Sequence, residues 1–106
     1  MFGEGNYMSV KGQTKERSKI GLKEPQQYNV IMLNDDFTTM EFVVEILIDI
    51  FHKDPVSAEK LMMTVHKGGS AIVGAYPYDI AVTKVNAATT RAKAQGFPFR
   101  MRIEGA

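Results

Sequence analysis

Apolar residues recur at strand spacing in three segments of the chain. The first, residues 26–33, ends in an unbroken apolar run, which is typical of a central strand with both faces covered. The second, residues 70–76, is short and contains Ile72 and Val73. In the third, residues 97–103, apolar residues alternate with arginines, which predicts one buried face and one solvent face.

Three further segments carry apolar residues at helical spacing. The first covers residues 39–52 and has its acidic residues opposite the apolar stripe. The second follows Asp54-Pro55, a pair that favours the start of a helix, and ends at about Lys67. The third starts at Pro77, has alanines on its inward stripe and stops at Gly96. We therefore predict an α+β domain with the order β-α-α-β-α-β, in which three helices pack against a three-stranded antiparallel sheet.

The N-terminal residues, up to the boundary at Pro25, follow neither period. They contain five basic and three acidic residues together with scattered apolar ones. Such a segment does not repay its ordering entropy by itself. We predict a flexible tail over residues 1–25 and a folded domain over residues 26–106.

Composition narrows the classes of function. The chain has 106 residues, 44% of them apolar, and a net charge of +1, which fits one compact domain. A nucleic-acid-binding surface normally shows a concentrated basic excess, which is missing. No apolar run approaches the roughly 20 residues that span a membrane, and the first ten residues lack the apolar centre of a signal peptide. Without cysteine, disulfides and thiolate-bound zinc are excluded, in agreement with a reducing compartment.

The polar turn after the first strand is the main candidate for function. Asn34, Asp35 and Asp36 offer mainly hydrogen-bond acceptors, which suits a small cationic donor group better than a phosphate. Thr38 and Glu41 have capping-box spacing, so we expect a helix to begin there. The alternative is an ordinary turn, because Asn and Asp are common turn residues.

Other chemistries have weaker support. His66 near the end of the second helix has two interpretations, a binding residue or a structural histidine favoured by the helix dipole. The two histidines show no HExxH-like pairing for a metal, and neither a cysteine nor a GxSxG motif suggests a hydrolase. We expect no catalytic residue, metal or cofactor.

A long contiguous motif closely resembles the signature of the ClpS family of proteolytic adaptors. Two distant segments agree with it, and the resemblance covers about residues 26–104. The matching residues are Tyr28-x-Val30-Ile31-x-Leu33-Asn34-Asp35-Asp36-Phe37-Thr38-x-Met40-Glu41-Phe42-Val43, then Ala58, Leu61-Met62, Val65-His66 and Gly69, and finally Ala81-x-Thr83-Lys84-Val85.

The resemblance implies an adaptor of the bacterial cytoplasm rather than an enzyme. Members capture proteins that begin with Leu, Phe, Tyr or Trp and deliver them to the ClpA unfoldase, an AAA+ protein of the ClpAP protease. The residues that match the family's α-amino site are Asn34, Asp35, Asp36 and His66, with Asp35 shaping or supplementing the turn. The residues that match its apolar specificity pocket are Leu33, Thr38, Met40, Val43, Met62, Val65 and Phe99.

The same resemblance gives the tail a role, because the unfoldase engages a flexible N-terminal extension in this family. Asp79 and Lys84 match the family's surface for docking the unfoldase. Pro77 and Val82 depart from the family's usual threonine and acid at this surface. Phe99 replaces the usual leucine, and we expect its larger ring to fill part of the pocket and narrow the preference toward Leu and Phe.

One alternative belongs to a different class. The same order of elements serves binding modules such as ribosomal stalk-like domains, which dock translation factors. A domain of that kind would show a basic helical face and would not need Asn34, Asp36 and His66 to converge on an apolar cavity.

Overall fold

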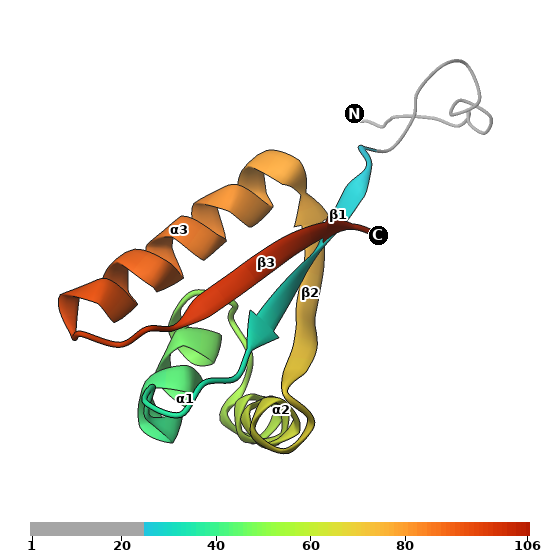
Figure 1. The fold of residues 1–106 in the computed structure, drawn as a ribbon. Coiled ribbons are helices and arrows are strands. Elements are labelled where there is room, and N and C mark those ends of the chain that lie inside the picture. The colour runs from blue at the N-terminus through green and yellow to red at the C-terminus, as the bar shows by residue number, and fades with distance from the viewer. Residues whose placement is uncertain (1–24) are drawn as a thin grey trace, which may run out of the picture.

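The computed structural model describes residues 25–106, so the predicted tail falls outside the described residues except for Pro25. In this part of the chain, helices and strands follow the predicted order (Figure 1). They are β1 (Gln27–Leu33), α1 (Met40–Asp49), α2 (Pro55–Gly68), β2 (Ser70–Pro77), α3 (Tyr78–Ala94) and β3 (Arg100–Gly105).

The sheet has the strand order β2-β1-β3, and both pairs are antiparallel. Val30 lies opposite Ile103 and Met32 lies opposite Met101. Val30, Ile31 and Met32 are all buried, which confirms the prediction that the unbroken apolar run forms a central strand. The first strand therefore fixes the positions of the other two.

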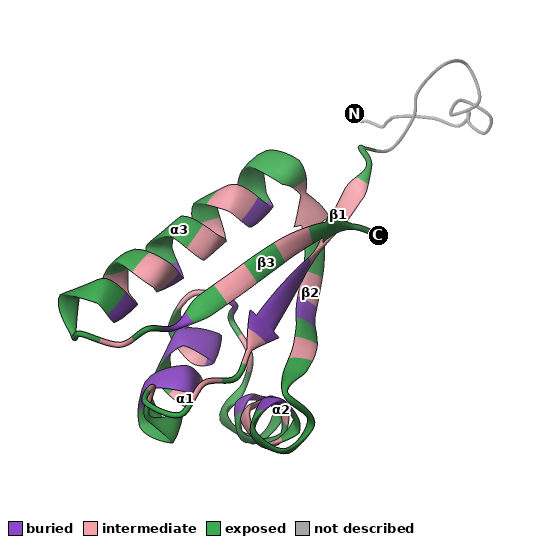
Figure 2. Ribbon diagram, in the orientation of Figure 1, coloured by how far each residue is buried: buried purple, intermediate pink, exposed green. Residues whose placement is uncertain are grey.

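Each of the three helices has buried positions (Figure 2), and these residues belong to one core cluster with Val30 and Met32 of β1. From α1 come Phe42, Val43, Ile46 and Leu47. The long helix α3 contributes only alanines to the fully buried set, at positions 81, 88 and 92. Because alanine is small, α3 can approach the strands closely, and it packs against all three of them.

The predicted limits of α1 need correction at both ends. Thr39, rather than Thr38, is the N-cap, since its hydroxyl accepts a hydrogen bond from the amide of Phe42 at 3.1 Å. The helix ends at Asp49 instead of near His52. His52 has a φ of 57°, a left-handed conformation that no helix can continue through.

The third strand starts three residues later than predicted. The amide of Phe97 donates to the carbonyl of Ala92 at the end of α3, so it takes no part in the sheet. Pro98 has no amide to donate. From Arg100 onward the predicted alternation holds: Arg100 and Arg102 are exposed, whereas Met101 and Ile103 are half-buried.

The close approach of α3 to the sheet can be tested by the substitution Ala88→Leu. Ala88 has no exposed surface, so the added side chain should overpack the core and lower the free energy of unfolding by about 1–3 kcal/mol. Ala87→Leu is the matched control, because Ala87 is exposed on the same helix and should change stability by less than about 0.5 kcal/mol. Urea unfolding would measure both, and equal midpoints would contradict the packing described here.

Candidate functional site

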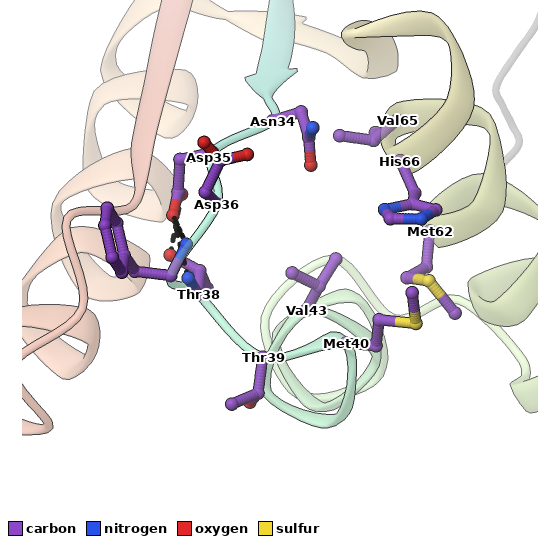
Figure 3. Close-up of a pocket in the computed structure, with 11 residues that line it drawn as sticks. Asn34, Asp35, Asp36, Thr38, Thr39, Met40, Val43, Met62, Val65 and His66 are labelled. Atoms are coloured by element: carbon purple, nitrogen blue, oxygen red, sulfur yellow. Dashed lines mark hydrogen bonds between the residues drawn. The ribbon is translucent and has the colours of Figure 1, made fainter.

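A cavity of about 390 Å³ opens where the turn after β1, the start of α1 and the last turns of α2 meet (Figure 3). These three parts of the chain are separated in sequence and are brought together by the fold. The lining residues are Asn34, Asp35, Asp36, Phe37, Thr38, Thr39, Met40, Val43, Met62, Val65 and His66.

One backbone hydrogen bond joins the two sides of this cavity. The amide of Asn34 donates to the carbonyl of Gly69 at 2.9 Å. Gly69 is the C-cap of α2 and has a φ of 92°, a conformation that glycine adopts without strain. The end of α2, which carries His66, is therefore held beside the turn that carries Asn34 and Asp36.

The turn itself is organised by Asp35. Its Oδ1 accepts hydrogen bonds from the amides of Phe37 and Thr38 at 2.8 and 2.7 Å, and its Oδ2 accepts one from the Thr38 hydroxyl at 2.7 Å. Partial burial raises the pKa of Asp35, but the bonds from Thr38 and Phe37 and the charge of Arg100 together outweigh it and lower that pKa below its ordinary value. Both carboxylate oxygens are thus used to shape the turn, which also explains why Thr38 does not cap α1.

Three other polar side chains remain available. Within residues 25–106, no hydrogen bond engages the side chains of Asn34, Asp36 or His66, and all three residues are exposed. In Figure 3 the amide of Asn34 and the ring of His66 lie on facing sides of the same space. Asn34 and Asp36 supply oxygen acceptors, and a neutral imidazole supplies one nitrogen acceptor. The site can therefore surround a compact cationic donor.

The remaining wall of the cavity is apolar. Val43 and Val65 belong to the buried core, whereas Met40 is 44% exposed. The side chains of Met40 and Met62 lie next to each other at one side of the cavity (Figure 3). Methionine is flexible and polarisable, so this side can adapt to apolar groups of different shape.

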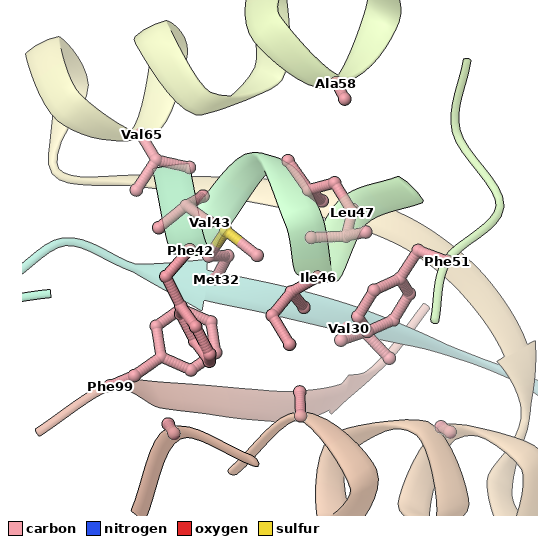
Figure 4. Close-up of a cluster of buried hydrophobic side chains, with 14 residues drawn as sticks. Val30, Met32, Phe42, Val43, Ile46, Leu47, Phe51, Ala58, Val65 and Phe99 are labelled. Atoms are coloured by element: carbon pink, nitrogen blue, oxygen red, sulfur yellow. The ribbon is translucent and has the colours of Figure 1, made fainter. Parts of the chain in front are cut away.

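Two residues predicted for the apolar pocket do not line the cavity. Leu33 is the last residue of β1, and Phe99 is 5% exposed within the core. The ring of Phe99 packs edge-on against Phe42, with ring centroids 5.8 Å apart (Figure 4). The expectation that Phe99 narrows the cavity therefore has no geometric support. Phe37 and Thr39 line the cavity but were not predicted, although both lie within the motif that identified their neighbours.

Asp79 and Lys84, the two residues predicted to dock the unfoldase, have different surroundings. Asp79 is exposed in the first turn of α3, where its carboxylate accepts a hydrogen bond from the amide of Ile80. Lys84 is half-buried, and its ammonium donates to the carbonyl of Ile50 at 2.7 Å. The same ammonium lies over the rings of Phe51 and Tyr76, 5.8 and 5.3 Å from their centroids. Lys84 thus ties α3 to the end of α1.

Two further features are absent from residues 25–106. These residues contain no group of three or more His, Asp or Glu side chains that could hold a metal ion. None of the helices formed by this part of the chain is long and apolar enough to cross a membrane.

Comparisons with known proteins agree on one family. The family model of the ATP-dependent Clp protease adaptor protein ClpS matches residues 23–102. The chain is 50% identical over 99 residues to the ATP-dependent Clp protease adapter protein ClpS of Treponema denticola, covering 92% of this chain and 98% of that protein. Its identity to the protein of the same name from Clostridium acetobutylicum is 47% over 98 residues, covering 91% and 97% of the two chains.

A solved structure has the same fold. It is the structure of Agrobacterium tumefaciens ClpS2 bound to L-phenylalaninamide, with a TM-score of 0.75 and 40% sequence identity. The match covers 78% of this chain and 100% of that one.

The role of Asp35 in the turn can be tested by Asp35→Ala at two pH values. At pH 7 the substitution removes three hydrogen bonds and should lower the free energy of unfolding by about 1–2 kcal/mol, as loss of a helix cap does. Because folding lowers the pKa of this carboxyl, its contribution is present above the unfolded value near 3.8 and is lost as the pH falls through the folded value. Denaturant unfolding should therefore show a gap between the two proteins that closes on acidification, and a constant gap would argue against an ionised carboxylate.

Proposed function

This chain belongs to the ClpS family of Clp protease adaptors, and we propose that it binds the N-terminal residue of substrate proteins that begin with Leu, Phe, Tyr or Trp. It then delivers them to a ClpA-type AAA+ unfoldase of the ClpAP protease. The observation that carries the proposal is the cavity, in which unengaged acceptors and an apolar wall face the same space.

The polar side of the cavity suits a free α-amino group. That group is a compact cation with three donors, and charged hydrogen bonds of this kind contribute roughly 1.5–3 kcal/mol each. Asn34 and Asp36 would accept two of them, and a neutral His66 nitrogen would accept the third. Asp35 acts indirectly in this proposal, since its own oxygens already hold the turn.

The apolar side suits the side chain of the same residue. Met40, Val43, Met62 and Val65 would surround it, with Thr38 beside them. Burying a Leu or Phe side chain contributes about 1.5–3 kcal/mol, which is too little for firm binding without the amine. The ligand of Agrobacterium tumefaciens ClpS2, L-phenylalaninamide, combines the same two features, a free α-amino group and an apolar side chain. The polar side of the site would thus bind the α-amino group and the apolar side would bind the side chain. Only an unmodified N-terminus offers both groups.

Delivery requires a second surface and a segment that the unfoldase can engage. We assign the surface to α3, with Asp79 as its exposed charge. Lys84 contributes chiefly by fixing α3 against α1, because its ammonium is already engaged there. The segment would be the N-terminal tail, residues 1–25, which carries the corresponding role in the family.

The stalk-like alternative has less support. A domain of that kind would not need a cavity that combines polar acceptors with an apolar wall, and Asn34, Asp36 and His66 line such a cavity. A binding assay with an acetylated peptide distinguishes the two proposals.

Acetylating the N-terminus of a Phe-initiated peptide should abolish measurable binding. Acetylation removes the positive charge and most donors, and it leaves Asn34 and Asp36 desolvated without partners, at roughly 1–3 kcal/mol per group. Calorimetric titration of the free and acetylated peptides would measure the difference. Equal affinity for the two peptides would refute the α-amino site.

Deleting residues 1–20 should separate capture from delivery. The cavity is built entirely from residues 34–66, so the affinity for a Phe-initiated peptide should stay within about twofold of the full chain. Degradation of a Phe-initiated protein by the unfoldase and its protease should stop. If the truncated adaptor supported degradation at the full rate, the tail would have no part in delivery.

A further inference from the structure

A groove of about 290 Å³ lies between α2 and β2. It shares no lining residue with the cavity described above, and neither Asp79 nor Lys84 lines it. The two sites use different faces of α2, since Leu61 lines the groove whereas Met62 and Val65 line the cavity. We call it the α2–β2 groove.

The floor of the groove is apolar because β2 carries a bulge. In a regular strand, neighbouring side chains point to opposite faces, yet both Ile72 and Val73 line the groove. The register between β1 and β2 shifts at this point, and Val73 is the extra residue on β2. Val73 belongs to the buried core, whereas Ile72 is 56% exposed. The described residues thus leave much of the apolar surface of Ile72 uncovered.

β2 is also an edge strand. The strand order β2-β1-β3 gives it a neighbour on one side only. Outside the pairing of β1 with β2, no backbone group of residues 70–76 forms a backbone hydrogen bond with another described residue. An open edge can accept an extended segment as an added strand, and a bulge keeps such pairing short. The groove therefore favours a short extended segment.

The charge of the groove is positive. Among the described residues that line it, Lys53 and Lys60 carry the only charges, and neither forms an ion pair with an acid of residues 25–106. The two hydroxyl groups of the lining are already used, because Ser57 donates to the carboxylate of Asp54 and Thr64 donates to the carbonyl of Lys60. The side-chain donors left for a ligand are two ammonium groups, which suit carboxylates.

We propose that the α2–β2 groove docks an extended segment of a second protein, in which aliphatic residues are interspersed with Asp or Glu. The aliphatic side chains would cover Ile72 and Leu61, and the long, flexible side chains of Lys53 and Lys60 would reach the carboxylates. The N-terminal part of the chain does not have this chemistry, because residues 1–24 contain five basic and three acidic residues. A nucleic acid would leave the apolar floor unused.

The test uses three N-acetylated peptides, which lack the α-amino group that the cavity is proposed to bind. Gly-Glu-Ile-Glu-Val-Glu-Gly has the proposed chemistry, Gly-Gln-Ile-Gln-Val-Gln-Gly lacks its charge, and Gly-Glu-Ser-Glu-Ser-Glu-Gly lacks its aliphatic residues. At low salt, fluorescence anisotropy of the labelled peptides should show that the full-length protein binds the first at least about fivefold more tightly than either of the others. The advantage over the glutamine peptide should shrink as salt is added, because exposed charges are screened.

Three variants locate the binding. Lys60→Glu reverses one charge of the groove and should weaken binding of the Glu-Ile-Glu-Val-Glu peptide about threefold to tenfold. Ile72→Thr keeps a β-branched residue on the strand but removes aliphatic surface, and it should also weaken binding at least about threefold. Lys93→Glu is the matched control, since Lys93 is exposed on α3 outside the groove and should keep the wild-type affinity to within about twofold.

Equal affinities for the three peptides, or equal losses in Lys60→Glu and Lys93→Glu, would overturn the proposal. A single-stranded oligonucleotide that displaces the peptide and binds Ile72→Thr as well as the wild type would overturn it in favour of phosphate binding. Dimers of the wild type that Ile72→Thr dissociates would assign the groove to a second copy instead. The inference does not depend on the proposed function, because a Phe-initiated peptide that failed to bind would leave these results unchanged.

Discussion

The arrangement of the candidate site depends on the hydrogen bond from the amide of Asn34 to the carbonyl of Gly69. It joins the residue after β1 to the residue after α2, two positions that are 35 residues apart in the chain. It extends the pairing of β1 with β2, in which Leu33 lies opposite Ser70, and so holds the acceptors on the turn close to the end of α2 that carries His66. A glycine in the left-handed conformation is what allows α2 to end there and β2 to begin at once.

The rigidity of the turn follows from two adjacent threonines with separate tasks. The hydroxyl of Thr38 donates to Asp35, and the hydroxyl of Thr39 accepts from Phe42 to cap α1. The turn and the helix are therefore stabilised independently. The Asp35 carboxylate is committed to the turn, whereas the proposed ligand contacts fall to Asn34 and Asp36. In the proposed function, local stability and ligand binding thus use different atoms of the same short segment.

Much of the fold follows from strong local signals in the sequence. The unbroken apolar run of β1 and the Asp54-Pro55 start of α2 predict the elements found there. The wrong predictions concern side chains that have more than one possible partner or environment. Thr38 has the spacing of a cap, but Asp35 engages its hydroxyl, which spacing cannot reveal. The alternation of apolar residues and arginines in residues 97–103 correctly predicts that Phe99 faces inward. It does not show whether the ring packs in the core beside Phe42 or lines the cavity.

In the proposed function, one cavity binds both the α-amino group and the side chain of a substrate's first residue. The most direct measurement is a calorimetric titration with peptides that differ only in that residue. Phe, Leu, Tyr and Trp should bind, whereas Asp, Ser and Gly should bind at least about tenfold more weakly, because they bury little apolar surface against Met40, Val43, Met62 and Val65. Equal affinity across the series would contradict the account.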